Sequence, residues 1–252
     1  MSSERSSYNC INQVRNIAIV GATHGNELHG TYLVKEFNSV AKAAELKASY
    51  PSLCIRGHIG NVSAAKAVGT GAGLRYCETD LNRCFMVKDL ADSGITSIEG
   101  LRAKEIDALL GPKCSENPKT DLILDLHSTT SNTGILLCCH PHDMFSLRLI
   151  AHLQSVYPDI SLSLWGVDDP PFLPTVARSG MTIEVGPISH STSNTTLYHY
   201  TKKILNDALN YVENHNKWVV NGMPTERLKN FKLILYKRFA SVSFPRDKDG
   251  KK

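Results

Sequence analysis

Two histidines and one glutamate in this chain have a spacing that is typical of metal ligands. His24 and Glu27 form an H-x-x-E pair, and His127 ends a second segment, Asp125-Leu126-His127. Two imidazoles, one carboxylate and an open fourth position make up a catalytic zinc site. The pattern therefore predicts that His24, Glu27 and His127 bind one Zn²⁺ and that the reaction is a metal-assisted hydrolysis.

Glu184 interrupts an otherwise apolar run, MTIEVG over residues 181–186. A carboxylate in such a run costs free energy unless it is paired or used in chemistry. Hydrolysis of an amide needs a group that takes a proton from water and passes it to the leaving amine. Glu184 is the candidate for this role, which suits a partly buried carboxyl with a raised pKa.

Each of these residues also has an ordinary structural interpretation. H-x-x-E pairs occur by chance. His24 could be a polar group where a helix starts, with Glu27 helping to satisfy the first backbone amides of that helix. His127 could equally be a hydrogen-bonded histidine of the core.

Short apolar strands are the elements that must position these residues. Residues 17–20 read IAIV before His24, and residues 122–124 read LIL before Asp125. Such runs are typical of buried parallel strands. Parallel strands bring the residues at their carboxyl ends to one edge of the sheet, where ligands bind in open α/β folds. The common position of the polar residues after apolar runs favours the metal site.

The rest of the chain alternates between helical and strand-like patterns, which predicts an α/β fold with a mixed, mostly parallel sheet flanked by helices. Apolar residues at three-to-four spacing predict a helix over 26–46. Thr96 and Glu99 predict a capping box that opens a helix through Leu110. Further strands are expected at 53–60 and 134–139, further helices at 144–156 and 195–214, and irregular segments at 61–95 and 167–179.

Length and composition limit the class of protein. With 252 residues, 42% of them hydrophobic, the chain can bury the core of one main domain with a small appendage. We expect no membrane span, which needs roughly 18 apolar residues, and no signal peptide, because the start MSSERSS is polar. Seven cysteines without a C-x-x-C pair favour reduced thiols and a cytoplasmic location.

The net charge of +4 is unevenly distributed. Ten Lys or Arg and three Asp or Glu lie from Lys217 onward, against eighteen and twenty-one before it. A basic tail can indicate contact with nucleic acid. This tail lacks the interleaved aromatic residues on which bases stack, so we expect a solvated surface and no nucleic-acid partner.

Four motifs resemble the aspartoacylase/aminoacylase-3 family, which belongs to a wider zinc-carboxypeptidase-like group with succinylglutamate desuccinylase. The motifs are VGATHGNELHG at 20–30, DLNRCF at 80–85, DLHSTTSNTG at 125–134 and IEVGP at 183–187. The resemblance covers nearly the whole chain in the right order. It implies a mixed sheet flanked by helices, followed by a β-rich C-terminal domain, and an enzyme that deacylates N-acyl amino acids.

The resemblance implies a role for each candidate of the metal centre. His24, Glu27 and His127 match the zinc ligands, and Glu184 matches the general base and acid. Zinc lowers the pKa of its water to roughly 7, which supplies a nucleophile at neutral pH. Asp125, two residues before His127, points to the same face of its strand and could orient that imidazole.

The resemblance also implies substrate-binding roles for three loop residues. Arg75 matches the arginine that polarises the scissile carbonyl, and this interaction strengthens as charge develops. Asn82 and Arg83 match the residues that hold the substrate's α-carboxylate, for which the planar guanidinium fork of an arginine is well suited. The ordinary interpretation is that arginines in loops are solvated and that D-L-N-R is a turn or a helix cap.

The chain departs from the family pattern in two places. Aspartoacylases proper have an arginine ten residues before the catalytic glutamate, where this chain has Pro174, although Arg178 lies nearby. This departure favours N-acyl amino acids other than acetylaspartate, such as acetylated aromatic ones. The chain also ends near the start of the family's C-terminal β domain.

We therefore expect residues 1–216 to form a zinc-hydrolase catalytic domain and residues 217–252 to form a truncated, β-rich C-terminal segment with strands over 231–243. Strands without their sheet expose edges that favour association, which leaves a homo-oligomer open. Two alternatives to a deacylase also stay open. One is a carboxypeptidase-like peptidase, and the other is a catalytically weak or dead zinc-binding homologue that pairs with a full-length relative.

Overall fold

A computed structural model describes residues 12–68, 73–166, 168–222 and 232–235 of the chain. Within these ranges six strands form one sheet in the order β2-β1-β3-β6-β4-β5. The strands are β1 (Asn16–Gly21), β2 (Cys54–Ile59), β3 (Leu122–Ser128), β4 (Gly134–Cys139), β5 (Ser161–Leu164) and β6 (Ser179–Gly186). The first four strands of the sheet order are mutually parallel, whereas β4 runs antiparallel to β6 and parallel to β5. The predicted mixed, mostly parallel sheet is confirmed.

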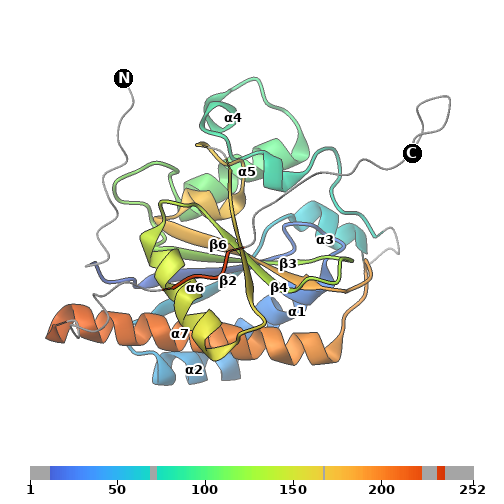
Figure 1. The fold of residues 1–252 in the computed structure, drawn as a ribbon. Coiled ribbons are helices and arrows are strands. Elements are labelled where there is room, and N and C mark those ends of the chain that lie inside the picture. The colour runs from blue at the N-terminus through green and yellow to red at the C-terminus, as the bar shows by residue number, and fades with distance from the viewer. Residues whose placement is uncertain (1–11, 69–72, 167, 223–231, 236–252) are drawn as a thin grey trace.

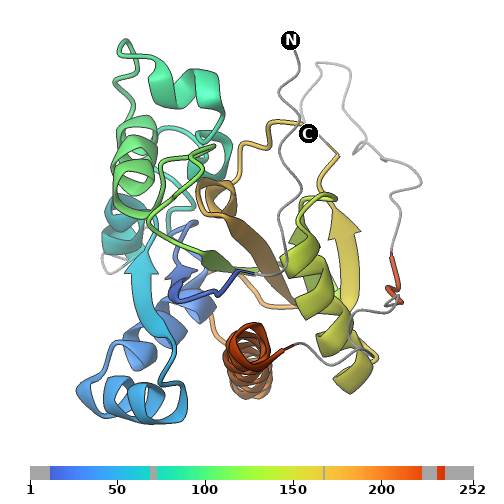
Figure 2. The ribbon, with the colours of Figure 1, turned by 90° about the vertical axis from the view of Figure 1, so that its left-hand side faces the viewer.

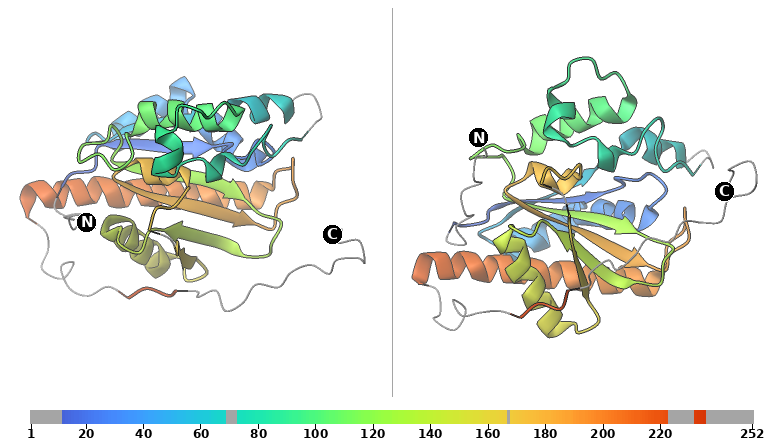
Figure 3. Two further views of the ribbon diagram at one scale, coloured as in Figure 1. Left: turned by 90° about the horizontal axis from the view of Figure 1, so that it is seen from above. Right: turned by 45° about the horizontal axis from the view of Figure 1, so that its top comes forward.

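Helices cover both faces of this sheet (Figure 1). The helices and 3-10 turns are α1 (Leu28–Phe37), α2 (Val40–Ser49), α3 (Val62–Val68), η1 (Leu81–Arg83), α4 (Val87–Ala91), α5 (Ile98–Leu110), α6 (Met144–Val156), η2 (Leu173–Val176) and α7 (Thr195–Asn221). Figure 2 looks along α7 and shows it between α1 and α2 on one side and α6 on the other, while Figure 3 shows α7 extending along one face of the sheet, roughly in line with the strands. In the part of the chain that the structure describes, no helix combines the length and the apolar character that a membrane crossing requires.

Alternate side chains of the central strands enter two separate apolar clusters. In β3, Leu122, Leu124 and Leu126 lie in the larger cluster with residues of α1, α6 and α7, whereas Ile123 lies in the smaller cluster with residues of α5, η1 and η2. Successive side chains of a strand point to opposite faces, so His127 lies on the same face as Ile123. The functional groups of β3 therefore face the side of the sheet that carries α5 and the two 3-10 turns.

The helix that we predicted over 26–46 is wrong, because the structure has two helices there. Ser39 separates the two helices because it is the N-cap of α2: its side chain accepts a hydrogen bond from the backbone nitrogen of Lys42. Asn38 exchanges two hydrogen bonds of 3.0 Å with the backbone of Gly57 in β2. The break is thus fixed by a neighbouring strand that the helical pattern does not reveal.

The predicted capping box at the start of α5 is also wrong. Ser97, not Thr96, is the N-cap and accepts from the backbone nitrogen of Gly100, while Glu99 is completely buried. The predicted end of this helix at Leu110 is confirmed.

Other predicted boundaries differ in extent. The segment 61–95, predicted as irregular, contains α3, η1 and α4, and α7 extends to Asn221 instead of 214. The strands predicted at 231–243 lie outside the described residues, except for 232–235. In that segment, Leu235 forms a parallel bridge to Leu162 of β5.

Close packing of β1 against α1 makes Gly21 a sensitive position for stability. A methyl group at Gly21 would lie 2.3 Å from the carbonyl oxygen of Gly30 in α1. We expect Gly21→Ala to lower the free energy of unfolding by about 1–3 kcal/mol or more, because neither backbone can easily give way. Urea unfolding measures the change. Gly166→Ala is the control, since a methyl there meets nothing within 4 Å; equal losses in both variants would contradict the prediction.

Candidate metal centre and active site

Three neighbouring strands bring the predicted polar residues to one edge of the sheet. β1, β3 and β6 are adjacent and parallel, so their carboxyl ends lie together. His24 and Glu27 follow β1, and His127 lies near the end of β3. The strand register pairs His127 with Glu184 of β6. The shared edge that we predicted from the apolar runs is confirmed.

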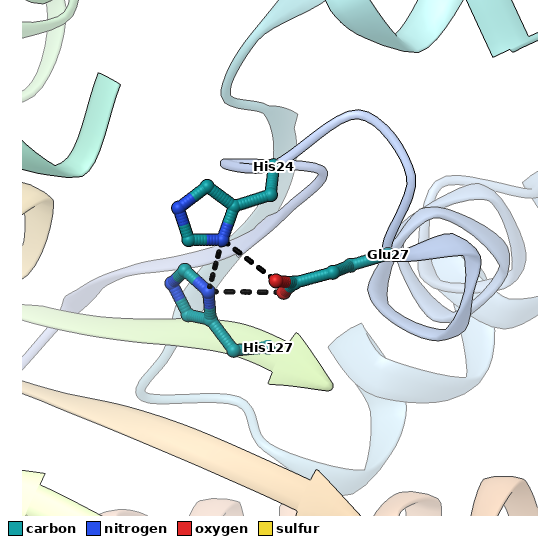
Figure 4. A group of neighbouring side chains, drawn as sticks. All are labelled: His24, Glu27 and His127. Atoms are coloured by element: carbon teal, nitrogen blue, oxygen red, sulfur yellow. Dashed lines mark hydrogen bonds and ion pairs between the residues drawn. The ribbon is translucent and has the colours of Figure 1, made fainter. Parts of the chain in front are cut away.

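The side chains of His24, Glu27 and His127 point toward one another (Figure 4). The Nδ1 atom of His24 lies 2.7 Å from Oε1 of Glu27, and the Nδ1 atom of His127 lies 3.0 Å from Oε2 of the same carboxylate. The two Nδ1 atoms are 3.1 Å apart. All three residues are buried, and their nitrogen and oxygen atoms converge closely enough to hold a metal ion.

Glu27 directs its carboxylate into this centre and not toward the helix that it precedes. It occupies the N-cap position of α1, but its side chain makes no capping hydrogen bond. Besides the two histidines, its carboxylate accepts from the backbone nitrogen of Ser128 at 2.9 Å. The alternative in which Glu27 satisfies the first amides of the helix is therefore wrong.

Two further carboxylates fix the protonation of the imidazoles. Oδ1 of Asp80 lies 3.0 Å from Nε2 of His24, and Oδ2 of Asp125 lies 2.8 Å from Nε2 of His127. The other oxygen of Asp125 accepts from the Thr23 hydroxyl at 2.6 Å. An acceptor at Nε2 favours a proton there, so that a cation which displaces the proton of Nδ1 can bind the Nδ1 lone pair. Both imidazoles are thus arranged to coordinate through Nδ1, so the residues fit a divalent metal.

The electrostatics of the centre follow from buried charges in contact. Burial raises the pKa of Glu27, but the charge and hydrogen bonds of His127 and His24 hold it well below its usual range. Burial lowers the pKa of His127, but Asp125 and Glu27 raise it well above the usual value. Burial raises the pKa of Glu184, which the neighbouring His127 opposes only in part. Glu184 therefore holds a proton more readily than Glu27 or Asp80 does.

Arg75 reaches the same centre from an irregular segment. One guanidinium nitrogen donates to Oε1 of Glu27 at 2.9 Å, and the backbone carbonyl of Arg75 accepts from Gly25 at 2.9 Å. The second guanidinium nitrogen lies 2.9 Å from Nε2 of His24 and 3.7 Å from Oδ2 of Asp80. In the tautomer that binds a metal through Nδ1, Nε2 of His24 carries the proton and donates it to Asp80. The contact between Nε2 and the Arg75 guanidinium then joins two donors and is not a hydrogen bond.

Asn82 and Arg83 lie in η1, directly after Asp80. The backbone nitrogen of Asn82 donates to Oδ1 of Asp80 at 2.9 Å, and its buried side-chain oxygen accepts from Leu173 at 2.9 Å. Arg83 is exposed, and its guanidinium lies 5.3 Å from the ring centroid of Phe172. The structure thus joins Asn82 to the metal centre through Asp80 and leaves Arg83 accessible beside an aromatic ring.

Asp80 is the residue of this site that the sequence analysis missed. Burial raises its pKa, but its hydrogen bond and attraction to His24, together with Arg75 and Arg83, lower it to about 2. Its place in the D-L-N-R motif, two residues before Asn82, was the available signal.

Arg178 does not replace the arginine that is absent at Pro174. Its guanidinium pairs with Asp121 at 2.8 Å. Both residues directly precede strands, β6 and β3 respectively. They therefore lie at the edge of the sheet opposite to His127.

Comparisons with known proteins agree with this geometry. The model of the succinylglutamate desuccinylase/aspartoacylase catalytic domain matches residues 13–212. A probable aspartoacylase of Nostoc sp. is 34% identical over 241 residues, which cover 95% of this chain and 76% of the relative. An N-acyl-aromatic-L-amino acid amidohydrolase (carboxylate-forming) of Homo sapiens is 30% identical over 245 residues, which cover 94% and 71%. The crystal structure of murine aminoacylase 3 superimposes with a TM-score of 0.80 at 29% identity, covering 95% of this chain and 76% of that one.

Proposed function

Because the chain belongs to the succinylglutamate desuccinylase/aspartoacylase family of hydrolytic enzymes, we propose that it is a zinc-dependent amidohydrolase that cleaves N-acyl amino acids into a carboxylate and a free amino acid. The convergence of His24, Glu27 and His127 at one buried point carries the proposal. Two imidazoles and one carboxylate are the protein ligands of many catalytic zinc sites. When bound, one zinc ion per chain supplies a Lewis acid that polarises a carbonyl and makes water a stronger acid.

Glu184 moves the proton in this proposal. Its carboxylate lies beside His127 in the adjacent strand and is largely shielded from solvent, which raises its pKa. It accepts a proton from the attacking water and then donates that proton to the nitrogen of the departing amine. A single, partly buried carboxyl can perform both steps because its raised pKa lies closer to neutrality.

Arg75 and Arg83 position the substrate. The Arg75 guanidinium, which Glu27 holds at the metal centre, donates to the scissile carbonyl oxygen as negative charge develops on it. Arg83 offers an exposed, planar guanidinium that binds the α-carboxylate in a bidentate manner. Asn82 supports this arrangement by tying η1 to the backbone of Leu173 at the start of η2.

The substrates that we favour are acetylated aromatic amino acids over acetylaspartate. The family resemblance places Pro174 at the position of the arginine that helps to hold the second carboxylate of acetylaspartate, and the guanidinium of Arg178 pairs with Asp121 instead. The proposal also includes a cytoplasmic location, which the lack of a C-x-x-C pair among the seven cysteines of the sequence favours, and no nucleic-acid partner.

Amino-acid release from a small substrate panel tests the proposed function. The panel contains acetylaspartate, acetylated aromatic amino acids and a short peptide. We expect release from acetylated amino acids, complete loss after removal of metal by a chelator, and recovery with one equivalent of zinc. Folded protein that holds stoichiometric zinc but releases nothing from any acetylated amino acid would refute the proposal, and release from the peptide alone would indicate a carboxypeptidase-like activity.

A further inference from the structure

The segment 75–80 carries two groups of the metal centre but contains no helix or strand. At one end Arg75 donates to Glu27, and at the other end Asp80 accepts from His24. A segment without regular structure needs other partners for its backbone groups. These partners determine how firmly Arg75 and Asp80 are held.

Glu99, in the first turn of α5, binds the backbone nitrogens in the middle of this segment. Its completely buried carboxylate accepts from three consecutive backbone nitrogens, those of Cys77 at 2.6 Å, Glu78 at 3.1 Å and Thr79 at 3.1 Å. The side-chain amide of Asn61 donates a fourth hydrogen bond at 3.0 Å. Burial raises the pKa of Glu99, but these four bonds lower it below the usual value, so the group stays charged.

The contact between the segment and α5 is reciprocal. The carboxylate of Glu78 accepts from the backbone nitrogen of Ile98, the first residue of α5, at 2.6 Å. Asn61, which binds Glu99, also donates its backbone nitrogen to the carbonyl of Ala22 at 2.8 Å. Ala22 is two residues before His24. Glu99 therefore connects the segment 75–80 with the loop that carries the first metal ligands.

We propose that Glu99 is a positioning residue that holds the segment 75–80 against the metal centre, so that Arg75 meets the scissile carbonyl and Asp80 keeps His24 oriented. The proposal rests on the proposed function, since Arg75 acts on a substrate only in that reaction. In this proposal Glu99 does not touch the substrate and influences the reaction only through the segment 75–80. A carboxylate that three consecutive amides require cannot be replaced by an amide group, which offers a single accepting oxygen.

Glu99→Gln is the decisive variant. Its amide nitrogen would face backbone donors, so part of the four-bond network is lost. We expect kcat to fall about 10–100-fold, because a small displacement of Arg75 disturbs the reacting geometry, while KM changes less than about threefold because Arg83 lies outside the held segment. Hydrogen exchange of the Cys77, Glu78 and Thr79 amides should accelerate while the strands stay protected.

Asp143→Asn is the matched control for loss of a buried carboxylate. Asp143 also accepts four hydrogen bonds, from the backbone and hydroxyl of Ser146, the hydroxyl of Ser179 and the backbone of Gly180. It lies by the start of β6, at the opposite edge of the sheet from Glu184. We expect a comparable loss of stability but an unchanged kcat. Glu78→Ala is a milder second variant should Glu99→Gln fail to fold, and it should lower kcat about 2–10-fold.

The two readouts separate failure of this proposal from failure of the proposed function. Equal kcat values for Glu99→Gln and Asp143→Asn, or unchanged exchange at residues 77–79, would overturn the positioning role. If the unmodified protein releases no amino acid, the proposed function fails. In that case hydrogen exchange at residues 77–79 still decides whether Glu99 holds the segment.

Discussion

Glu184→Gln is expected to lower kcat about 10²–10⁴-fold, the usual contribution of a positioned acid or base. Glutamine has nearly the same shape as glutamate, so the β6 strand and its pairing with His127 should persist. The amide, however, neither accepts a proton from water nor donates one to the departing amine. Zinc content should stay near one per chain, since the candidate ligands lie elsewhere.

The measurement is kcat for the best substrate of the panel, with zinc determined on the same samples. Glu105→Gln makes the same chemical change on α5, where Glu105 is exposed and pairs only at the surface with Arg102, and it should leave kcat unaltered. A Glu184→Gln protein that retains kcat within tenfold of the unmodified chain would show that another group transfers the proton.

Local sequence patterns predicted much of the fold because the central strands β1, β3 and β6 are buried on both faces. The expected strand at 134–139 and the helix at 144–156 coincide with β4 and α6. Residues 134–139 form a short, continuous run without charged residues, the apolar residues of 144–156 recur at helical spacing, and Asp143 caps α6 from the preceding turn. Where the local pattern and the tertiary environment agree, the element and even its limits can be predicted.

The elements that were missed depend on contacts between distant segments. The break between α1 and α2 depends on Asn38 meeting Gly57. The start of α5 was misplaced because the carboxylate of Glu99 accepts hydrogen bonds from the backbone nitrogens of residues 77–79 and does not cap the helix to which it belongs. In both cases a polar side chain that could serve its own helix binds a separate segment, and a single sequence does not reveal which choice is made.

The candidate site also contains residues that local patterns predict and residues that depend on contacts between distant segments. The convergence of His24 and His127 could be predicted because each follows an apolar run of a parallel strand, and the pairing of β1 with β3 brings the ends of these runs together. Asp80 follows no strand, and its partner His24 is 56 residues away. The sequence alone also allowed Arg178 to take the place of the missing arginine at Pro174, whereas in the structure Arg178 forms an ion pair with Asp121.

Glu27→Gln is expected to weaken zinc binding by more than about 100-fold, beyond the 10–100-fold range that is typical of residues that only orient a ligand. The carboxylate of Glu27 faces both Nδ1 atoms and supplies the negative charge of the predicted ligand set. Glutamine keeps a neutral oxygen, but its amide hydrogens would compete with a cation for an imidazole lone pair. Competition with a chromophoric chelator measures the affinity, and activity at limiting zinc should fall in parallel.

Two further variants turn this prediction into a graded series. Asp125→Asn removes a charge that contacts His127 through Nε2, the nitrogen that faces away from the proposed metal, so its effect should fall in the 10–100-fold range. Glu36→Gln changes a carboxylate of α1 that pairs with Lys202 away from the centre, and should leave zinc affinity unchanged. A direct ligand, an orienting group and a remote charge must give effects in that order. If Glu27→Gln binds zinc as tightly as Asp125→Asn does, Glu27 orients the site without coordinating the metal.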